Sequence, residues 1–218
     1  MLLYWVSLCA HPCTNTLNQT KRDGNYVLKS AASLLKGGSP LKSISSPKGT
    51  RSLCLFFKEI PGSVPVDGCL VHEGLSLLYV GSSPDKKSKP DATQTLQQRV
   101  RYHFQGNADK STLRRSLGIL LAPESHFPLR RVGSGKKMTL TTPGEQWLDS
   151  WMEKNAFVTW VEHEEPWTLE NELFQSVALP LNIQGNKQHP FAALLLKKRE
   201  EAIALATDAP IVQDSAKG

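Results

Sequence analysis

The spacing of apolar positions predicts alternating strands and helices along most of the chain. A short apolar run at 75–81 ends on glycine and is followed by two serines, which is typical of a buried strand that enters a turn. In the segment 95–104 the apolar residues Leu96, Val100 and Phe104 recur every four positions. This spacing predicts a helix with one buried stripe.

A second face of the same predicted helix carries polar residues with useful chemistry. Arg99, Tyr102 and His103 are spaced i, i+3 and i+4, so their side chains can converge on one spot. An arginine offers a bidentate fork to a phosphate, and histidine and tyrosine can move protons. With Tyr79 at the end of the preceding strand, the pattern predicts a phosphate-handling site.

The remaining pattern predicts an α+β protein. Apolar runs predict strands at 52–58 and 156–163, and a hairpin whose arms, 68–72 and 75–81, meet around Glu73-Gly74. Helical spacing and capping signals predict further helices at 112–121 behind Ser111, at 143–155, from Thr168 onwards and at 192–206. We expect a small antiparallel three-stranded sheet flanked by helices.

The two motifs together carry a resemblance to a known family. Tyr79-Val80-Gly81, followed after a spacer by Leu96-x-x-Arg99-x-x-x-His103-Phe104, resembles the GIY-YIG nuclease superfamily. The resemblance implies that Tyr79 belongs to the second half motif and that Arg99 is the catalytic arginine. It also matches His103 to a histidine found in several restriction-enzyme members of the superfamily.

A second stretch extends the resemblance, which runs roughly from residue 66 to 182. The segment around Glu170 and the Pro180-Leu181-Asn182 run are similar to the metal-binding glutamate and the following asparagine of the family. With Thr168 as the expected N-cap, Glu170 would lie in the first helical turn, where the helix dipole favours a charged carboxylate. A single carboxylate suits one Mg²⁺ or Mn²⁺ ion that keeps several waters.

One expected residue of the family pattern is missing. The first half motif, Gly-x-Tyr, is expected at Gly68-Cys69-Leu70, where leucine stands in place of tyrosine. Because leucine neither donates nor accepts a hydrogen bond, this departure bears on activity.

The implied activity is metal-dependent hydrolysis of phosphodiester bonds by a DNA endonuclease. Glu170 would hold the ion, Arg99 would offset charge on the phosphorus, and Asn182 would orient Glu170 or its loop. Either Tyr79 or His103 would accept the proton of the attacking water. One alternative is a catalytically impaired domain that binds nucleic acid. Another is a structural or interaction domain that exposes Trp147, Trp151 and Trp160.

Charge is unevenly distributed along the 218 residues, whose formal net charge is +6. Residues 85–137 hold twelve Lys and Arg against four acids, whereas residues 145–172 hold eight acids and one lysine. A basic part of this kind favours a polyanionic partner. The expected nucleic-acid contacts lie in a helix and in a glycine-rich hairpin: Arg114, Arg115, Arg130, Arg131, Lys136 and Lys137.

The domain organisation and location follow from composition. Residues 1–51 are basic and linker-like and predict a flexible extension, 52–191 the nuclease-like domain, and 192–218 a helix and tail. The four cysteines have no zinc-ligand spacing, which indicates thiols in a reducing compartment. The chain also has no apolar run long enough to cross a membrane, so we expect a cytoplasmic protein.

Overall fold

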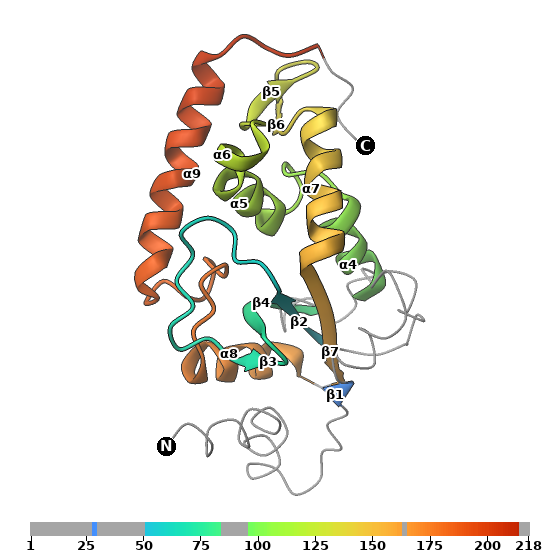
Figure 1. Cartoon of the computed structure of the whole chain (residues 1–218), viewed down its shortest axis with the longest axis vertical. Coiled ribbons are helices and arrows are strands. Elements are labelled where there is room, and N and C mark those ends of the chain that lie inside the picture. The colour runs from blue at the N-terminus through green and yellow to red at the C-terminus, as the bar shows by residue number, and fades with distance from the viewer. Residues whose placement is uncertain (1–27, 30–50, 84–95, 163–164, 214–218) are drawn as a thin grey trace, which may run out of the picture. The chain divides into compact units, whose positions relative to one another are not determined.

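A five-stranded sheet organises the first part of the structure, a computed structural model that describes residues 28–29, 51–83, 96–162 and 165–213 (Figure 1). Most of the predicted extension 1–51 lies outside the described residues. The strand order is β1-β7-β2-β4-β3. The strands are β1 (Leu28–Lys29), β2 (Arg51–Phe57), β3 (Val71–His72), β4 (Leu75–Ser83) and β7 (Ala156–Glu162).

The described chain divides into two units. The first contains residues up to Lys58, Val66–Gln97 and Phe157–Leu179, and includes nearly all of the sheet. The second contains Glu59–Pro65, Gln98–Ala156 and the chain from Pro180 onwards. The predicted α+β class is confirmed, and the expected three-stranded sheet is widened at its edges by β1 and β3, which have two residues each.

The predicted hairpin is present and has the expected turn. β3 pairs with β4 in antiparallel register, with His72 opposite Leu75. The two residues between them, Glu73 and Gly74, have φ values of 49° and 78°. Positive φ at both central positions is the type I′ geometry, which matches the twist of the flanking strands.

A bulge in β4 determines which side chains share a face of the sheet. Leu55 of β2 lies opposite Tyr79, but Phe56 lies opposite Leu77, so Leu78 is the extra residue. The alternation therefore shifts by one at this point. Val80 shares a face with Leu77 rather than with Tyr79.

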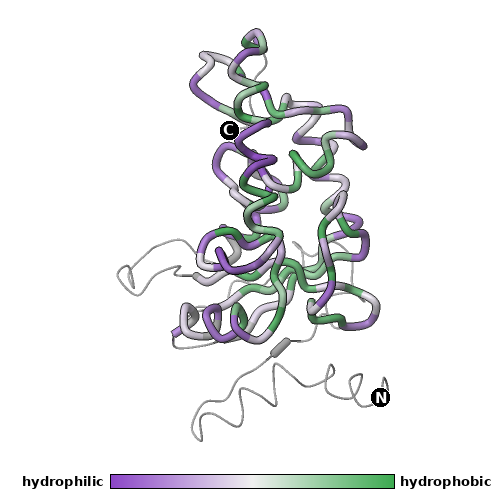
Figure 2. Tube along the Cα trace, turned by 90° about the vertical axis from the view of Figure 1, so that its left-hand side faces the viewer, coloured by the Kyte–Doolittle hydropathy of each residue, from purple (hydrophilic) through white to green (hydrophobic). Residues whose placement is uncertain are grey.

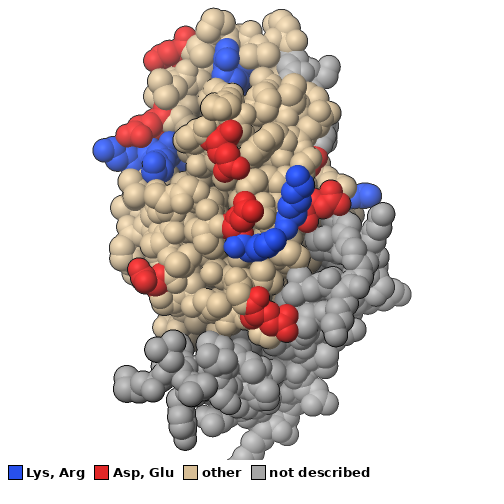
Figure 3. All heavy atoms as spheres, viewed as in Figure 1, with Lys and Arg blue, Asp and Glu red and all other residues tan. Residues whose placement is uncertain are grey.

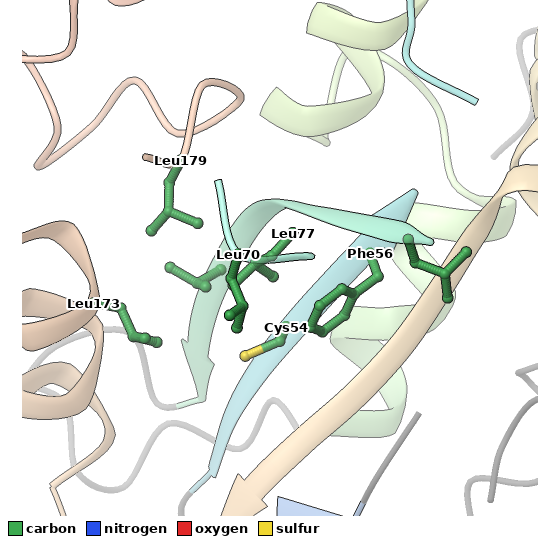
Figure 4. Close-up of a cluster of buried hydrophobic side chains, with 8 residues drawn as sticks. Cys54, Phe56, Leu70, Leu77, Leu173 and Leu179 are labelled. Atoms are coloured by element: carbon green, nitrogen blue, oxygen red, sulfur yellow. The ribbon is translucent and has the colours of Figure 1, made fainter. Parts of the chain in front are cut away.

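That face is covered by the helix α8 (Pro166–Ser176) and the segment that follows it. The buried cluster contains Cys54, Phe56, Leu70, Leu75, Leu77, Val80, Leu173 and Leu179 (Figure 4). In Figure 2 hydrophobic and hydrophilic residues alternate in short stretches along the trace. Burying a leucine side chain stabilises a fold by about 1.5–3 kcal/mol, so this cluster fixes α8 against the sheet.

The start of α8 differs from the sequence-based expectation. The N-cap is Glu165 and not Thr168, and the helix begins at Pro166. Proline is favoured at the first helical position because its missing N–H would have no partner there. The Thr168 hydroxyl donates to the Glu165 carboxylate at 3.3 Å. Glu170 consequently lies in the second turn, where the influence of the helix dipole is weaker than in the first.

The second unit is mostly helical. Its helices are α4 (Leu96–Gln105, shared at its start with the first unit), α5 (Thr112–Leu120), α6 (Ala122–Ser125), α7 (Thr142–Asn155) and α9 (Pro190–Asp208). The hairpin of β5 (Arg130–Val132) and β6 (Lys137–Thr139) completes it. Ser111 is the N-cap of α5 as predicted, since its hydroxyl accepts a hydrogen bond from the Arg114 N–H at 3.2 Å.

A buried ion pair connects the elements of this unit. The side chains of Arg114 in α5 and Glu145 in α7 are both 0% exposed, and their charged atoms lie 2.6 Å apart. Arg114 also donates to the carbonyls of His103 and Phe104 at the end of α4, at 3.1 and 2.9 Å. A further contact at 2.8 Å joins Arg114 to Asp149.

The other carboxylate oxygen of Glu145 is equally well satisfied. It accepts from the backbone N–H of Ala108 at 2.8 Å, from that of Leu140 at 3.3 Å, and from the Thr139 hydroxyl. The pair therefore ties α4, α5, α7, β6 and the turn after α4 into one structure. Among the described residues, no helix is long and apolar enough to cross a membrane.

We predict that Arg114→Met lowers the free energy of unfolding by about 3–5 kcal/mol, because it leaves the Glu145 charge buried without its partner. Urea denaturation followed by circular dichroism measures the change. Lys197→Met is the matched control, since Lys197 forms only an exposed contact to Glu201 at 3.9 Å. Equal stability of the two variants would contradict a structural role for Arg114.

Candidate functional site

The predicted site residues are distributed over both units. Tyr79 of β4 and Glu170 of α8 belong to the first unit. Arg99 and His103 of α4, and Asn182 in the segment after Pro180, belong to the second.

The Glu170 carboxylate is held by a residue that the sequence reasoning missed. The hydroxyl of Ser82 donates to Glu170 Oε2 at 2.6 Å. Ser82 is completely buried, and Glu170 is half-buried. Ser82 directly follows Tyr79-Val80-Gly81. This position next to the second half motif is the sequence feature that could have identified it as a site residue.

Tyr79 lies on the other face of β4 from this carboxylate contact. After the bulge, Val80 and Ser82 share the face covered by α8, whereas Tyr79 points to the opposite face. The Tyr79 side chain is only 9% exposed. The register thus does not place its hydroxyl beside the Ser82–Glu170 pair.

The strand that runs alongside the second half motif is β2. Leu53, Cys54 and Leu55 lie directly opposite Gly81, Val80 and Tyr79. The segment Gly68-Cys69-Leu70, where the first half motif was expected, lies ahead of β3 instead. There the carbonyl of Leu70 accepts from the Leu77 N–H at 2.8 Å, and the Leu70 side chain belongs to the buried cluster.

The three α4 side chains predicted to converge differ in their exposure to solvent. Tyr102 is 46% exposed, whereas His103 is 7% exposed. Arg99 is half-buried, and its Nε atom is buried without a hydrogen-bond partner among the described residues. A buried donor of this kind is costly to leave unpaired, so it is a feature that a bound anion would satisfy.

His103 is embedded in the interior of the second unit. Its Nδ1 atom lies 3.0 Å from the Ser111 hydroxyl, which also caps α5. Burial lowers the pKa of His103 from 6.5 to about 3, and the positive charges of Arg99 and Arg114 add to the effect. The imidazole is therefore neutral near neutral pH and a weak proton acceptor.

Asn182 is buried in the turn that precedes α9. The side chain of Asn186 donates to the Asn182 carbonyl at 3.4 Å, and both residues are at most 5% exposed. His189 then caps α9, since its Nδ1 atom accepts from the Phe191 N–H at 3.2 Å. These contacts give the turn a defined shape.

Both predicted nucleic-acid contacts in α5, Arg114 and Arg115, have internal partners. The guanidinium of Arg114 is fully buried against Glu145, so the expectation that it contacts nucleic acid is wrong. Arg115 donates to the Ala108 carbonyl at 3.0 Å and pairs with Asp109 at 3.3 Å, which holds the turn after α4.

The arginines of the basic hairpin also bond to the backbone of their own chain. Arg130 and Arg131 donate to the carbonyls of Pro210 and Ala209 at 2.9 and 3.1 Å, which holds the segment after α9. The N–H of Gly133 donates to the Val212 carbonyl at 2.9 Å. The arginines thus anchor the chain that follows α9.

Lys136 and Lys137 are exposed at the tip of this hairpin and remain open to a partner. On the face of the molecule shown in Figure 3, acidic and basic side chains are interspersed. The basic character of the sequence therefore does not gather into one broad patch on that face.

The donor chemistry around Glu170 bears on the expected metal. Among the described residues, no group of three or more His, Cys, Asp or Glu side chains could hold a metal ion. Glu170 offers a half-buried carboxylate, and oxygen ligands of this kind suit a hard ion that retains most of its waters.

The tryptophans give little support to an interaction domain that presents them. Trp151 and Trp160 are 6% and 4% exposed, and Trp147 is half-buried. Trp151 and Trp160 are therefore core residues.

Comparison with known proteins gives one result. A model of the GIY-YIG catalytic domain matches residues 54–201, from β2 into α9. No curated protein and no solved structure matches the chain. The match covers well over half of the sequence and includes every predicted catalytic position. The chain therefore belongs to the GIY-YIG nuclease family.

Proposed function

We propose that this protein is a metal-dependent endonuclease that hydrolyses phosphodiester bonds in DNA within the cell. The observation that carries the proposal is the family match over residues 54–201, which contains the Tyr-Val-Gly motif, Arg99, His103, Glu170 and Asn182. The substrate, the ion and the roles below are parts of this proposal.

Arg99 is proposed to bind the scissile phosphate. The planar fork of a guanidinium matches the geometry of phosphate oxygens. The buried Nε donor, which lacks a partner among the described residues, supports this role. A preorganised donor of this type stabilises the charge that develops on the phosphate during hydrolysis.

Glu170 is proposed to hold a single Mg²⁺ or Mn²⁺ ion, with Asn182 as a supporting residue. A bound divalent ion would polarise the phosphate and stabilise the leaving oxygen. Glu170 contributes a carboxylate whose orientation is fixed by Ser82, so little reorganisation is needed when a cation binds.

His103 is the weaker of the two candidates for proton acceptor, which leaves Tyr79, although its side chain lies on the face of β4 opposite the Ser82–Glu170 contact. The lowered pKa of His103 and its contact with Ser111 indicate a neutral, structural imidazole. Tyr79 belongs to the second half motif itself. A Tyr79→Phe variant keeps the ring and removes only the hydroxyl, so it tests this assignment directly.

Lys136 and Lys137 are the proposed phosphate-backbone contacts outside the catalytic centre. They are the exposed members of the six predicted basic residues, whereas Arg114, Arg115, Arg130 and Arg131 bond to their own chain. Lysines at a hairpin tip supply sequence-independent attraction to DNA.

A second candidate function is nucleic-acid binding without cleavage. We infer that the first half motif falls on Leu53-Cys54-Leu55, because this part of β2 lies opposite Tyr79-Val80-Gly81 and the family match begins at residue 54. Leu55 and Leu70 are both buried leucines, so either assignment removes the expected tyrosine hydroxyl. This loss favours a catalytically impaired domain.

We predict that Glu170→Gln reduces metal-dependent nicking of supercoiled plasmid by at least about 100-fold, as does Arg99→Ala, since losing one preorganised electrostatic contact typically costs that much. Reactions contain Mg²⁺ or Mn²⁺, or a chelator. Glu172→Gln, an exposed carboxylate on the same helix, is the matched control and should retain activity. Full activity of both mutants would refute the endonuclease proposal.

If the wild type binds DNA in a mobility-shift assay but does not cut it under any metal condition, the binding-only candidate is supported. Arg99→Ala should then weaken binding while Glu170→Gln leaves it intact. Absence of binding at low salt would rule out both candidates.

We predict that stability falls as the pH is lowered from about 6.5 towards 3, in part because the unfolded chain protonates His103 and the native state does not. In His103→Asn this slope should be smaller by up to about 1.4 kcal/mol per pH unit. Urea denaturation at a series of pH values provides the measurement. An unchanged slope in His103→Asn would contradict this prediction.

We predict that Lys136→Ala and Lys137→Ala each lower DNA affinity and reduce the slope of log affinity against log salt by about 1. Fluorescence anisotropy at several salt concentrations measures both quantities. Arg130→Ala should instead lower the melting temperature, because it releases the segment after α9. An unchanged salt slope in both lysine variants would show that the hairpin tip does not contact DNA.

A further inference from the structure

We propose that Ser82 is a positioning residue that orients the Glu170 carboxylate for cation binding. The inference deepens the proposed function, because it rests on Glu170 as the metal-binding residue. The contact joins two elements far apart in sequence, the end of β4 and the second turn of α8.

The geometry of the contact is that of a strong, directed hydrogen bond. The Ser82 hydroxyl lies 2.6 Å from Glu170 Oε2. Hydrogen bonds from a hydroxyl to a carboxylate are short and about twice as strong as those between neutral groups. Ser82 is 0% exposed, so water does not compete for its hydroxyl.

The backbone around Ser82 is rigid. Ser82 pairs with Ser52 of β2 in the regular part of the ladder beyond the bulge. Val80, two residues earlier on the same face, is packed into the buried cluster with Leu173 of α8. Ser82 therefore lies on a strand that is paired with β2. Glu170 lies on α8, which packs against the same sheet through the buried cluster.

A carboxylate can accept more than one hydrogen bond or metal contact. Its two oxygens offer about four lone-pair positions, of which the Ser82 bond uses one. The bond restricts rotation of the Glu170 side chain, so a cation would meet a carboxylate that already has a defined orientation.

A purely structural role does not account for a hydroxyl at this position. The face of β4 that carries Ser82 is otherwise apolar, and β-branched apolar residues suit a buried strand better than serine. An alanine or valine would satisfy packing and leave Glu170 without its donor. The pairing with a half-buried carboxylate is the property that serine adds.

The test measures binding of Mn²⁺ to the full-length protein by electron paramagnetic resonance, without DNA. Ser82→Ala should weaken Mn²⁺ binding by about 10- to 100-fold, the usual cost of losing a residue that orients a metal ligand. Ser116→Ala, which removes another fully buried serine hydroxyl, is the matched control and should bind as the wild type does.

A second readout separates positioning from folding. In plasmid nicking, Ser82→Ala should require about 10- to 100-fold more metal for half-maximal rate. Its KM for DNA should stay unchanged. In the Glu170→Gln background, Ser82→Ala should cause no further loss of Mn²⁺ binding. Ser82→Thr, which keeps the hydroxyl, should restore most of it.

The outcomes distinguish this inference from the function on which it rests. If the wild type nicks DNA and Ser82→Ala has wild-type Mn²⁺ affinity and metal dependence, the positioning role is refuted and the nuclease proposal stands. Equal losses of Mn²⁺ binding from Ser82→Ala in the wild-type and Glu170→Gln backgrounds would also refute it. If the wild type neither binds Mn²⁺ nor nicks DNA, the proposed function itself fails.

Discussion

The buried ion pair between Arg114 and Glu145 is the interaction on which the second unit depends. Two opposite charges, both withdrawn from water, are tolerated only because every neighbouring donor and acceptor is arranged around them. Arg114 holds the carbonyls at the end of α4, and Glu145 holds the turn that follows. The helix that carries Arg99 is thereby fixed at its carboxyl end by a charge network and not by apolar contacts alone.

Two different kinds of interaction therefore fix the two groups of proposed catalytic residues. In the first unit, an apolar cluster holds α8 on the sheet and a single hydroxyl from Ser82 orients Glu170. In the second unit, the ion pair sets the position of α4, and burial keeps His103 neutral. Catalysis by positioned charges needs both kinds of rigidity, because a small displacement of a phosphate or an ion weakens every electrostatic contact.

The internal use of arginine changes how the charge of this protein is understood. Four of the six basic residues expected to contact nucleic acid bond to carbonyls or carboxylates of their own chain. Arginine suits this use since its planar fork satisfies several acceptors at once. The positive net charge remains a contribution to the overall field, but directed contacts with DNA are left to residues such as Lys136 and Lys137.

The sequence by itself determined the features that depend on neighbouring residues. The apolar stripe of α4, the Ser111 cap and the Glu73-Gly74 turn were all predicted, because spacing and backbone preference act within a few positions. The family motifs were recognisable for the same reason. Only the tertiary structure decided that β2 lies opposite Tyr79-Val80-Gly81, that Arg114 is internal, and that Ser82 contacts Glu170. Those contacts join distant segments, and an arginine or serine has the same local pattern whether its partner is a phosphate or a side chain of its own chain.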